Sequence, residues 1–174
     1  MDNILSWIIW IPIIGMVAIG FVPRGQQDLI KKIAAGTTGI QLLVAVLLWM
    51  TFDATDGSFQ FMERAEWIPS LGIAYILGVD GLSLPMVALN ALIAFLGVFV
   101  SWNIDRAVKG YFALFLLLDT GIMGVFLSLD FFLFYVFWEV MLLPMYFLIG
   151  MWGGPQREYA AIKFFLYTLF GSVL

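Results

Sequence analysis

Six long stretches of the 174-residue chain consist of apolar residues with almost no charge, and this pattern limits the fold more than any other feature. The stretches cover residues 4–22, 33–52, 82–102, 111–129, 131–152 and 159–174. A helix of about 20 residues is long enough to cross the roughly 30 Å hydrocarbon layer of a membrane. The sequence therefore predicts an all-α polytopic membrane protein with about six transmembrane helices, of which the sixth is truncated at Leu174.

The composition supports this class and excludes several kinds of chemistry. Hydrophobic residues make up 63% of the chain and charged residues 11%, compared with about 25% charged residues in soluble proteins. Without any Cys or His, the chain lacks the usual ligands of iron–sulfur clusters and haem, and only carboxylates remain for a transition metal. We expect no cofactor and no metal bound to this chain, and no nucleic-acid partner, because no basic stripe is present.

The amino terminus and one polar segment set the domain organisation. Asp2 precedes the first apolar stretch, where a signal peptide would carry Lys or Arg, so this stretch is interpreted as a retained span. Residues 53–80 are the one long polar excursion, and within them Gly and Pro punctuate short apolar runs over residues 67–80, which favours a small hairpin on the membrane face. We treat residues 1–174 as a single transmembrane domain with an extramembrane segment at 53–80.

Lys and Arg are distributed unequally between the two sides of the predicted bundle. The connections after the first, third and fifth spans contain six basic residues, Arg24, Lys31, Lys32, Arg106, Lys109 and Arg157. The opposite side has Arg64 alone. Cytoplasmic loops carry an excess of Lys and Arg, so the amino terminus and the 53–80 segment are predicted to lie outside.

The stretch at residues 131–152 carries one ionisable acid, Glu139, nine positions from its start. This depth is roughly 13 Å along the helix, near the centre of the hydrocarbon layer. A carboxylate there costs about 3 kcal/mol or more unless it faces protein or water. Pro144 follows five residues later and is predicted to kink the helix beside the acid. A proton-handling role is the preferred interpretation of Glu139, and an inert, hydrogen-bonded acid is the alternative.

Asp119 is a candidate partner for this acid. The connection between the fourth and fifth spans is very short, so the two helices should form a tight antiparallel hairpin, with Asp130 as the N-cap of the second. Asp119 and Glu139 then lie at nearly equal depth. If the two carboxyls face each other, repulsion and desolvation would make them share a proton. The alternative is a structural acid.

Three further side chains are candidates for supporting roles. Tyr135 and Tyr146 share a helix face with Glu139 and could order a short water wire, although such tyrosines are commonly packing residues. Lys163 lies five residues into the sixth span, where it either snorkels to the basic side or lines a channel.

The fifth stretch and its flanks, LDFFLFYVFWEVMLLPMYFLIGMWGG, resemble the M-type antiporter-like membrane subunit of respiratory complex I, called subunit 4 in mitochondria. The segment Phe137-Trp138-Glu139 followed by Pro144-Met145-Tyr146 is the specific part of the motif. Residues 79–83 (VDGLS) and 161–168 (AIKFFLYT) support the resemblance, which extends over essentially the whole chain as the amino-terminal part of a longer subunit.

This resemblance implies proton translocation in the membrane arm of an NADH:quinone oxidoreductase, so the chain would be an enzyme only as a translocase subunit. Glu139 matches the family's fifth-helix glutamate, whose partner is a lysine on a seventh helix that this sequence does not contain. The resemblance implies that NADH, flavin, iron–sulfur clusters and quinone bind to other subunits. It also implies other antiporter-like subunits as partners, in a bacterial plasma membrane or an organellar membrane.

Two other functions remain open at this point. The same helix plan occurs in subunits of Mrp-type cation/proton antiporters and of membrane-bound hydrogenases. A chain of this length could also be a fragment that packs in such an assembly without transporting protons.

Overall fold

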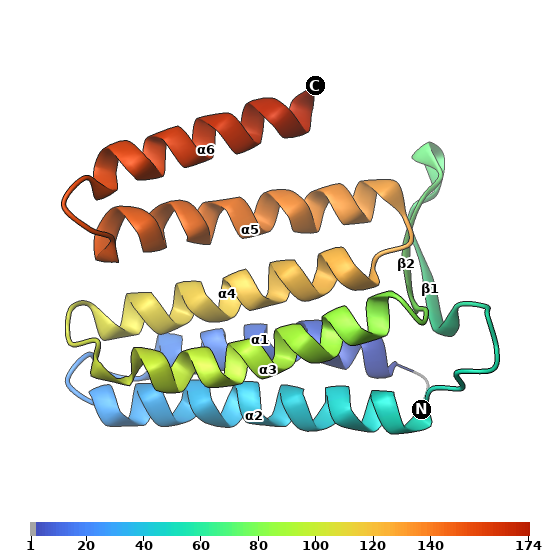
Figure 1. Ribbon diagram of the computed structural model, residues 1–174, viewed down its shortest axis with the longest axis horizontal. Helices are drawn as coiled ribbons and strands as arrows, with labels where there is room; N and C mark the ends of the chain where they lie inside the picture. The colour runs from blue at the N-terminus through green and yellow to red at the C-terminus, as the bar shows by residue number, and fades with distance from the viewer. Residues whose placement is uncertain (1–2) are drawn as a thin grey trace.

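Within residues 3–174, which the computed structural model describes, six α-helices lie side by side with roughly parallel axes (Figure 1). They are α1 (Ile4–Phe21), α2 (Gln27–Thr51), α3 (Ser83–Val100), α4 (Val108–Leu127), α5 (Phe131–Trp152) and α6 (Arg157–Val173). Helices α1 to α5 are long and apolar enough to cross a membrane, and α6 has 17 residues. The chain is a multi-pass integral membrane protein, as predicted. The expectation based on Asp2 falls outside the described residues.

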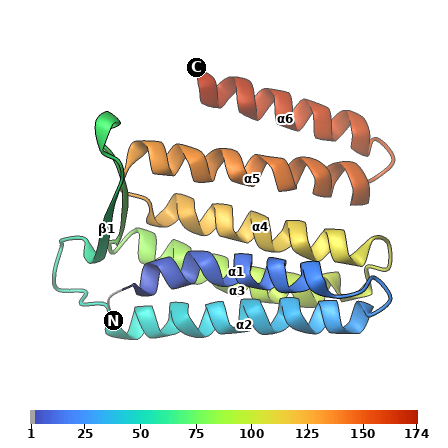
Figure 2. The same ribbon diagram turned by 180° about the vertical axis from the view of Figure 1, so that it is seen from behind.

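The helices form a four-helix bundle with two helices added at one side. Helices α1, α2, α3 and α4 pack against one another, α5 covers α4, and α6 covers α5 (Figures 1 and 2). Buried apolar side chains form two clusters inside the bundle, around Leu5, Met123 and Phe137 at one end and around Ile19 and Phe112 at the other. The core therefore sits mostly among α1 to α4, with α5 and β2 contributing at one end, and Ala161 is the buried residue of α6 among those described.

Local sequence signals place the ends of α5 where they were predicted. The Asp130 Oδ1 accepts hydrogen bonds from the backbone N–H groups of Phe132 (2.9 Å) and Leu133 (3.0 Å), which confirms its role as N-cap. The helix ends at Trp152, and the backbone N–H of Gly153 donates to the carbonyl of Ile149 at 2.9 Å. The helix continues through Pro144, which is buried.

Three helices, α2, α4 and α6, begin earlier than predicted, the last of them at Arg157 and not at residue 159, because their first turns contain polar residues. The predicted second span starts at residue 33, whereas α2 starts at Gln27. Its Lys31 side chain is buried and lies 3.9 Å from the carboxylate of Asp105 in the α3–α4 connection. In the same way α4 starts at Val108 and not at residue 111. A hydropathy pattern marks only the apolar part of a helix, so the turns near the membrane surface were missed.

The segment between α2 and α3 contains an antiparallel hairpin, which confirms the predicted hairpin and adds a small sheet to the all-α description. Strand β1 (Gln60–Ile68) pairs with β2 (Ile73–Val79), and the 3₁₀ turn η1 (Pro69–Leu71) and Gly72 join them. Gly72 has φ 68°, a conformation that glycine adopts without a steric penalty. The hairpin begins earlier than the predicted 67–80, because polar residues (Gln60, Glu63, Arg64 and Glu66) interrupt the apolar residues at the start of β1.

The hairpin is attached to the α4–α5 connection. The backbone N–H of Leu129 donates to the carbonyl of Ile76 at 2.9 Å, and the N–H of Ala74 donates to Asp130 Oδ2 at 3.4 Å. Asp130 therefore caps α5 with one oxygen and contacts β2 with the other. These bonds fix the start of α5, the helix that carries Glu139, to the extramembrane hairpin.

The VDGLS stretch forms the start of α3. The Asp80 Oδ1 accepts from the backbone N–H of Ser83 at 2.7 Å and from that of Leu82 at 3.1 Å, while the Asp80 N–H donates to Ser83 Oγ at 3.0 Å. The hydrogen bond from the Ser83 backbone holds the pKa of the Asp80 carboxyl below its usual value. This reciprocal arrangement satisfies N–H groups that the first turn of a helix leaves free.

The two ends of the bundle differ as the charge pattern predicted. The α1–α2, the α3–α4 (including η2, Ser101–Asn103) and the α5–α6 connections lie at one end, and the hairpin and the α4–α5 connection lie at the other (Figures 1 and 2). At the basic end, Lys109 Nζ donates hydrogen bonds to the carbonyls of Gly20 (2.7 Å) and Val22 (2.9 Å) at the end of α1. A cation at this position is favourable, because the C-terminal end of a helix carries a partial negative charge.

We expect a cysteine replacing Arg106, at the basic end, to react with a membrane-impermeant maleimide only from the cytoplasmic, matrix or stromal side. A cysteine replacing Asp56, at the hairpin end, should react only from the opposite side. Both side chains are exposed, and the chain has no natural Cys to add background labelling. The reverse labelling pattern would show that the positive-inside rule assigns the wrong orientation here.

Candidate functional site

Glu139 lies near the middle of α5 on the side that faces α6. Its side chain is half-buried, and its Oε1 accepts a hydrogen bond from Ser172 Oγ of α6 at 3.0 Å. The same serine hydroxyl also lies 3.0 Å from the carbonyl of Leu169. A serine hydroxyl has one proton to donate, so Ser172 can bond to the carboxylate or to its own helix but not to both at once.

Tyr135 joins Glu139 and Ser172 in one polar cluster. It precedes Glu139 by one helical turn on the same face of α5, and its hydroxyl lies near the Glu139 carboxyl and Ser172. We call these three residues the Glu139 cluster. A carboxyl with two hydroxyls can accept, hold and hand on a proton without any change in covalent bonding.

The Tyr146 ring packs against two other aromatic rings. Its ring meets Phe165 of α6 edge-on at a centroid distance of 5.6 Å and Phe147 at 5.3 Å. Among the described residues, the hydroxyl that bonds to Glu139 is that of Ser172 on α6. Whether Tyr135 belongs to a water wire stays a prediction.

Asp119 bonds to α3 and points away from Glu139, so the structure does not bring together the two carboxyls that could have shared a proton. Asp119 is 3% exposed and accepts a hydrogen bond from Asn90 Nδ2 of α3 at 2.7 Å. The faces that join α4 to α5 are instead those of Gly121 and Gly124 on α4 and of Met141 and Phe137 on α5. With 3.6 residues per turn, Asp119 and Glu139 each point away from this contact. The sequence left open whether the two carboxyls face each other, because the rotation of each helix about its axis cannot be read from one sequence.

Lys163 lies near the basic end, away from Glu139. Its Nζ lies over the Tyr159 ring at 5.7 Å from the centroid, and its side chain is exposed. It precedes Ser172 by nine residues, which is roughly 13 Å along α6. This placement agrees with the snorkelling alternative. In residues 3–174 no group of three or more Asp or Glu side chains could hold a metal ion.

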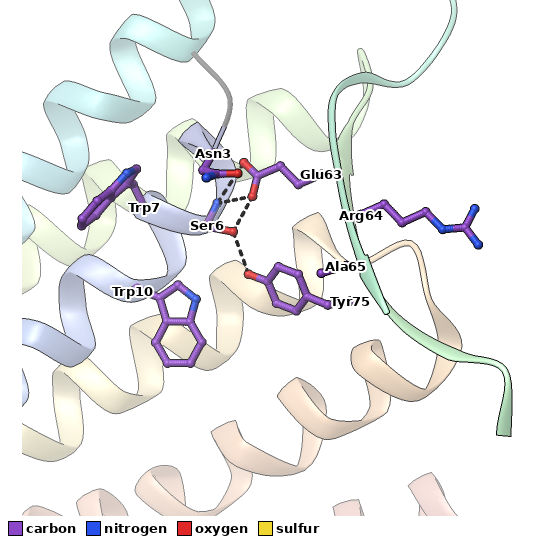
Figure 3. Close-up of a pocket in the computed structure, with 8 residues that line it drawn as sticks. All are labelled: Asn3, Ser6, Trp7, Trp10, Glu63, Arg64, Ala65 and Tyr75. Atoms are coloured by element: carbon purple, nitrogen blue, oxygen red, sulfur yellow. Dashed lines mark hydrogen bonds between the residues drawn. The ribbon is translucent and has the colours of Figure 1, made fainter. Parts of the chain in front are cut away.

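A second polar cluster ties the hairpin to α1 (Figure 3). The Glu63 carboxylate accepts from the backbone N–H of Leu5 at 2.8 Å, from that of Ser6 at 3.2 Å and from the Ser6 hydroxyl, which also lies 3.0 Å from the Tyr75 hydroxyl. Arg64 points away from this cluster. A carboxylate at the start of a helix satisfies its free N–H groups and its positive partial charge, so Glu63 has a structural role.

The sequence interpretation missed Ser172 and Glu63. Ser172 is a small polar residue in an apolar helix, one turn after Thr168, and small polar residues often mark helix–helix contacts in membranes. That signal was present in the sequence, although it does not show which residue Ser172 contacts. Glu63 gave no usable signal, because its contact with α1 joins residues separated by 58 positions.

Residues 128–174, which contain Glu139 and Ser172, match the family model described as "NADH:quinone oxidoreductase/Mrp antiporter, TM". The whole chain is 41% identical to NADH-quinone oxidoreductase subunit M of Rhodobacter capsulatus and covers 34% of that protein. It is 39% identical, over 97% of its length, to NADH-ubiquinone oxidoreductase chain 4 of Arabidopsis thaliana and also covers 34% of it. The chain thus spans about a third of the length of these curated relatives.

The fold is similar to that of a subunit in a solved assembly. A chain of the respiratory complex I from Thermus thermophilus with bound NADH superposes with a TM-score of 0.82 and 27% identity, over 97% of this chain and 33% of the other. The sequence and structure comparisons both cover nearly the whole chain. Over nearly all of its length the chain is therefore similar to M-type, or chain 4, membrane subunits of NADH:quinone oxidoreductases.

Proposed function

We propose that the complete protein is a proton-translocating subunit in the membrane arm of an NADH:quinone oxidoreductase, and that Glu139 binds and releases the transported proton. The observation that carries this proposal is the position of Glu139, a half-buried acid in the middle of a membrane-spanning helix that is bonded to the Ser172 hydroxyl and lies close to that of Tyr135. Intramembrane acids are costly and mark proton or ion pathways. The relatives are named as subunits of NADH:quinone oxidoreductases, and this is the assembly in which we place the site.

In this proposal the chain contributes proton handling and no electron transfer. Glu139 takes up a proton, and the hydroxyls of Tyr135 and Ser172 donate to the carboxylate when the proton has left. The absence of Cys and His from the sequence does not fit an iron–sulfur cluster or a haem. NADH, flavin, iron–sulfur clusters and quinone are accordingly assigned to other subunits, and no step of the reaction is placed on this chain.

The proposed partners are other membrane-arm subunits, including other antiporter-like subunits, and the surrounding lipid. The exposed faces of α5 and α6 support this assignment. Large apolar side chains such as Phe131 of α5 and Leu166 and Phe170 of α6 are exposed there, and α6 packs against the rest of the described chain mainly through α5. The proposed location is a bacterial plasma membrane or an organellar inner or thylakoid-type membrane.

A subunit of a Mrp-type cation/proton antiporter is the second candidate, because the matching family includes both kinds of assembly. The 41% identity to a protein named subunit M favours the first candidate. Electron transfer distinguishes the oxidoreductase candidate from the antiporter candidate, since an antiporter exchanges ions without an electron donor.

Purification of the complete protein through an affinity tag tests the proposal. We expect the isolated assembly to reduce a quinone analogue with NADH, and vesicles containing it to acidify only when NADH is supplied. An assembly that exchanges sodium for protons without any electron donor would support the antiporter alternative and contradict the proposal.

A further inference from the structure

Ser172 of α6 lies between the proposed proton site and the backbone of its own helix. Helices α5 and α6 pack side by side (Figure 1). The Ser172 Oγ is 3.0 Å from Glu139 Oε1 of α5 and 3.0 Å from the backbone carbonyl oxygen of Leu169. The hydroxyl therefore has two acceptors at equal distance. The carboxyl changes its charge when it binds a proton, whereas the carbonyl stays neutral.

Three threonines show the ordinary arrangement of a hydroxyl in an apolar helix. Thr38, Thr120 and Thr168 each donate to a carbonyl one turn earlier in the same helix, at 2.9–3.0 Å. Thr168 precedes Ser172 by one turn of α6, and its acceptor is the carbonyl of Phe164. Ser172 has the same kind of backbone acceptor and, in addition, a carboxyl on another helix. Its environment thus differs from that of a hydroxyl bonded only within its helix.

The charge of Glu139 decides how the hydroxyl is best used. A hydrogen bond to an ionised group is about twice as strong as one between neutral groups, so Ser172 donates to Oε1 when Glu139 is a carboxylate. A protonated carboxyl is itself a donor, and a serine hydroxyl has one proton and two acceptor lone pairs. A proton on Oε1 has the Ser172 oxygen as an acceptor at 3.0 Å. The Ser172 proton can then turn to the Leu169 carbonyl.

We propose that Ser172 is a positioning residue for Glu139 and that its hydroxyl reverses its role with the charge of the acid. In the ionised state Ser172 donates to Oε1. In the protonated state Oε1 carries the proton and donates it to Ser172 Oγ, while Ser172 donates to the Leu169 carbonyl. The O–H bond of Ser172 stays intact, and only the proton on Glu139 is bound or released. This inference rests on the proposed role of Glu139 in proton binding.

The reversal keeps the carboxyl in one place while its charge changes. In both states a hydrogen bond joins the same two atoms, Glu139 Oε1 and Ser172 Oγ, and only its direction differs. The carboxyl therefore stays turned towards α6, on the side of α5 opposite the contact with Gly121 and Gly124 of α4. A proton carrier held in a fixed position needs no rearrangement before each transfer. The Leu169 carbonyl is the part of α6 that responds to the charge of Glu139.

The other ionisable groups around Glu139 do not replace Ser172 in this role. On α5, Tyr135 lies near the carboxyl as a neutral phenol, and Tyr146 packs against Phe165. On the other elements packed against α5, ionisable side chains bond to residues outside α5 and α6, namely Asp119, Lys109 and Tyr111 of α4 and Tyr75 of β2. The ionisable residues of α6 are Arg157, Glu158, Tyr159 and Lys163 in its first two turns and the exposed Tyr167.

Infrared spectroscopy of the complete protein in lipid membranes tests the contact. The carboxyl bands of Glu139 are assigned by ¹³C-labelling of glutamate and by their loss in Glu139→Gln. We expect these bands to shift in Ser172→Ala, which removes only the hydroxyl, and to return towards their original frequencies in Ser172→Thr. Thr168→Val is the matched control, because it removes a hydroxyl of the same helix that bonds to Phe164. This control should leave the Glu139 bands unchanged.

A second label tests the reversal. The complete protein is prepared with ¹³C in the backbone carbonyl of leucine, and spectra recorded at alkaline pH are subtracted from spectra recorded at acidic pH. Protonation of Glu139 should be accompanied by a shift of a leucine carbonyl band, because Leu169 gains a hydrogen bond from Ser172. The leucine shift should be lost in Ser172→Ala and in Glu139→Gln, and it should remain in Thr168→Val.

The outcomes separate the role of Ser172 from the proposed function. Glu139 bands that Ser172→Ala leaves in place, or that Thr168→Val shifts equally, would overturn the positioning role. Protonation of Glu139 without a leucine shift would overturn the reversal, because Ser172 would then keep one acceptor in both states. A Glu139 carboxyl that keeps one charge state over the whole pH range would instead contradict the proposed function itself.

Discussion

Replacing Glu139 with Gln is expected to abolish proton movement driven by NADH oxidation in the complete assembly. Gln has the same shape as Glu, and its amide oxygen can still accept from the Ser172 hydroxyl that bonds to Glu139 Oε1 at 3.0 Å. The packing of α5 against α6 should therefore persist, and the subunit should still assemble. Gln does not bind or release a proton near neutral pH, so the proposed transfer step is lost.

The measurement is NADH-dependent acidification of membrane vesicles, together with the amount of assembled complex in the same membranes. Glu158→Gln is a matched control, because it removes an exposed carboxyl in the first turn of α6 by the same change of atoms. We expect that control to pump at the normal level. Normal pumping by Glu139→Gln would show that Glu139 is an inert acid. Loss of pumping together with loss of the assembled complex would show a structural role.

Much of the fold could be predicted from the sequence, because membrane-spanning helices depend on local signals. The apolar run of α5, the cap at Asp130 and the glycine at its end are all neighbours along the chain, and they placed both ends of this helix correctly. The tight α4–α5 connection and the separation of charge between the two ends follow from equally local patterns. Polar first turns, as in α2, lie outside what a hydropathy pattern measures.

The candidate site was predicted only in part, because its contacts depend on how each helix is rotated. Glu139 was identifiable as a costly charge at mid-membrane, and Tyr135 followed from helix periodicity. Whether Asp119 faces α5 or α3 depends on which side chains let the helices approach, and here glycines decide it. The partnership of Asp119 with Asn90 joins residues 29 positions apart on different helices, so no pattern within one helix could predict it.

The close approach of α4 and α5 depends on Gly121, and Gly121→Leu is expected to have the largest effect on stability among substitutions in this part of the chain. A Cβ added to Gly121 would lie 2.8 Å from the Cβ of Met141 and 3.1 Å from its backbone nitrogen. Backbone atoms cannot rotate aside as a side chain can, so the two helices would have to separate. Overpacking of this kind costs about 1–3 kcal/mol, and small residues are the usual means by which membrane helices approach closely.

The measurement is the thermal unfolding of the complete protein in detergent, compared with that of Gly36→Leu. A Cβ at Gly36, on the exposed side of α2, would meet no atom within 4 Å among the described residues, so this control adds the same side chain without a clash. Equal stability of the two variants would contradict the close contact.

Separation of α5 from α4 would also strain the hydrogen bonds between Asp130, Leu129 and the hairpin, which hold the start of α5. Gly121→Leu should therefore increase protease cleavage of the hairpin. The Gly36→Leu control should leave this cleavage unchanged.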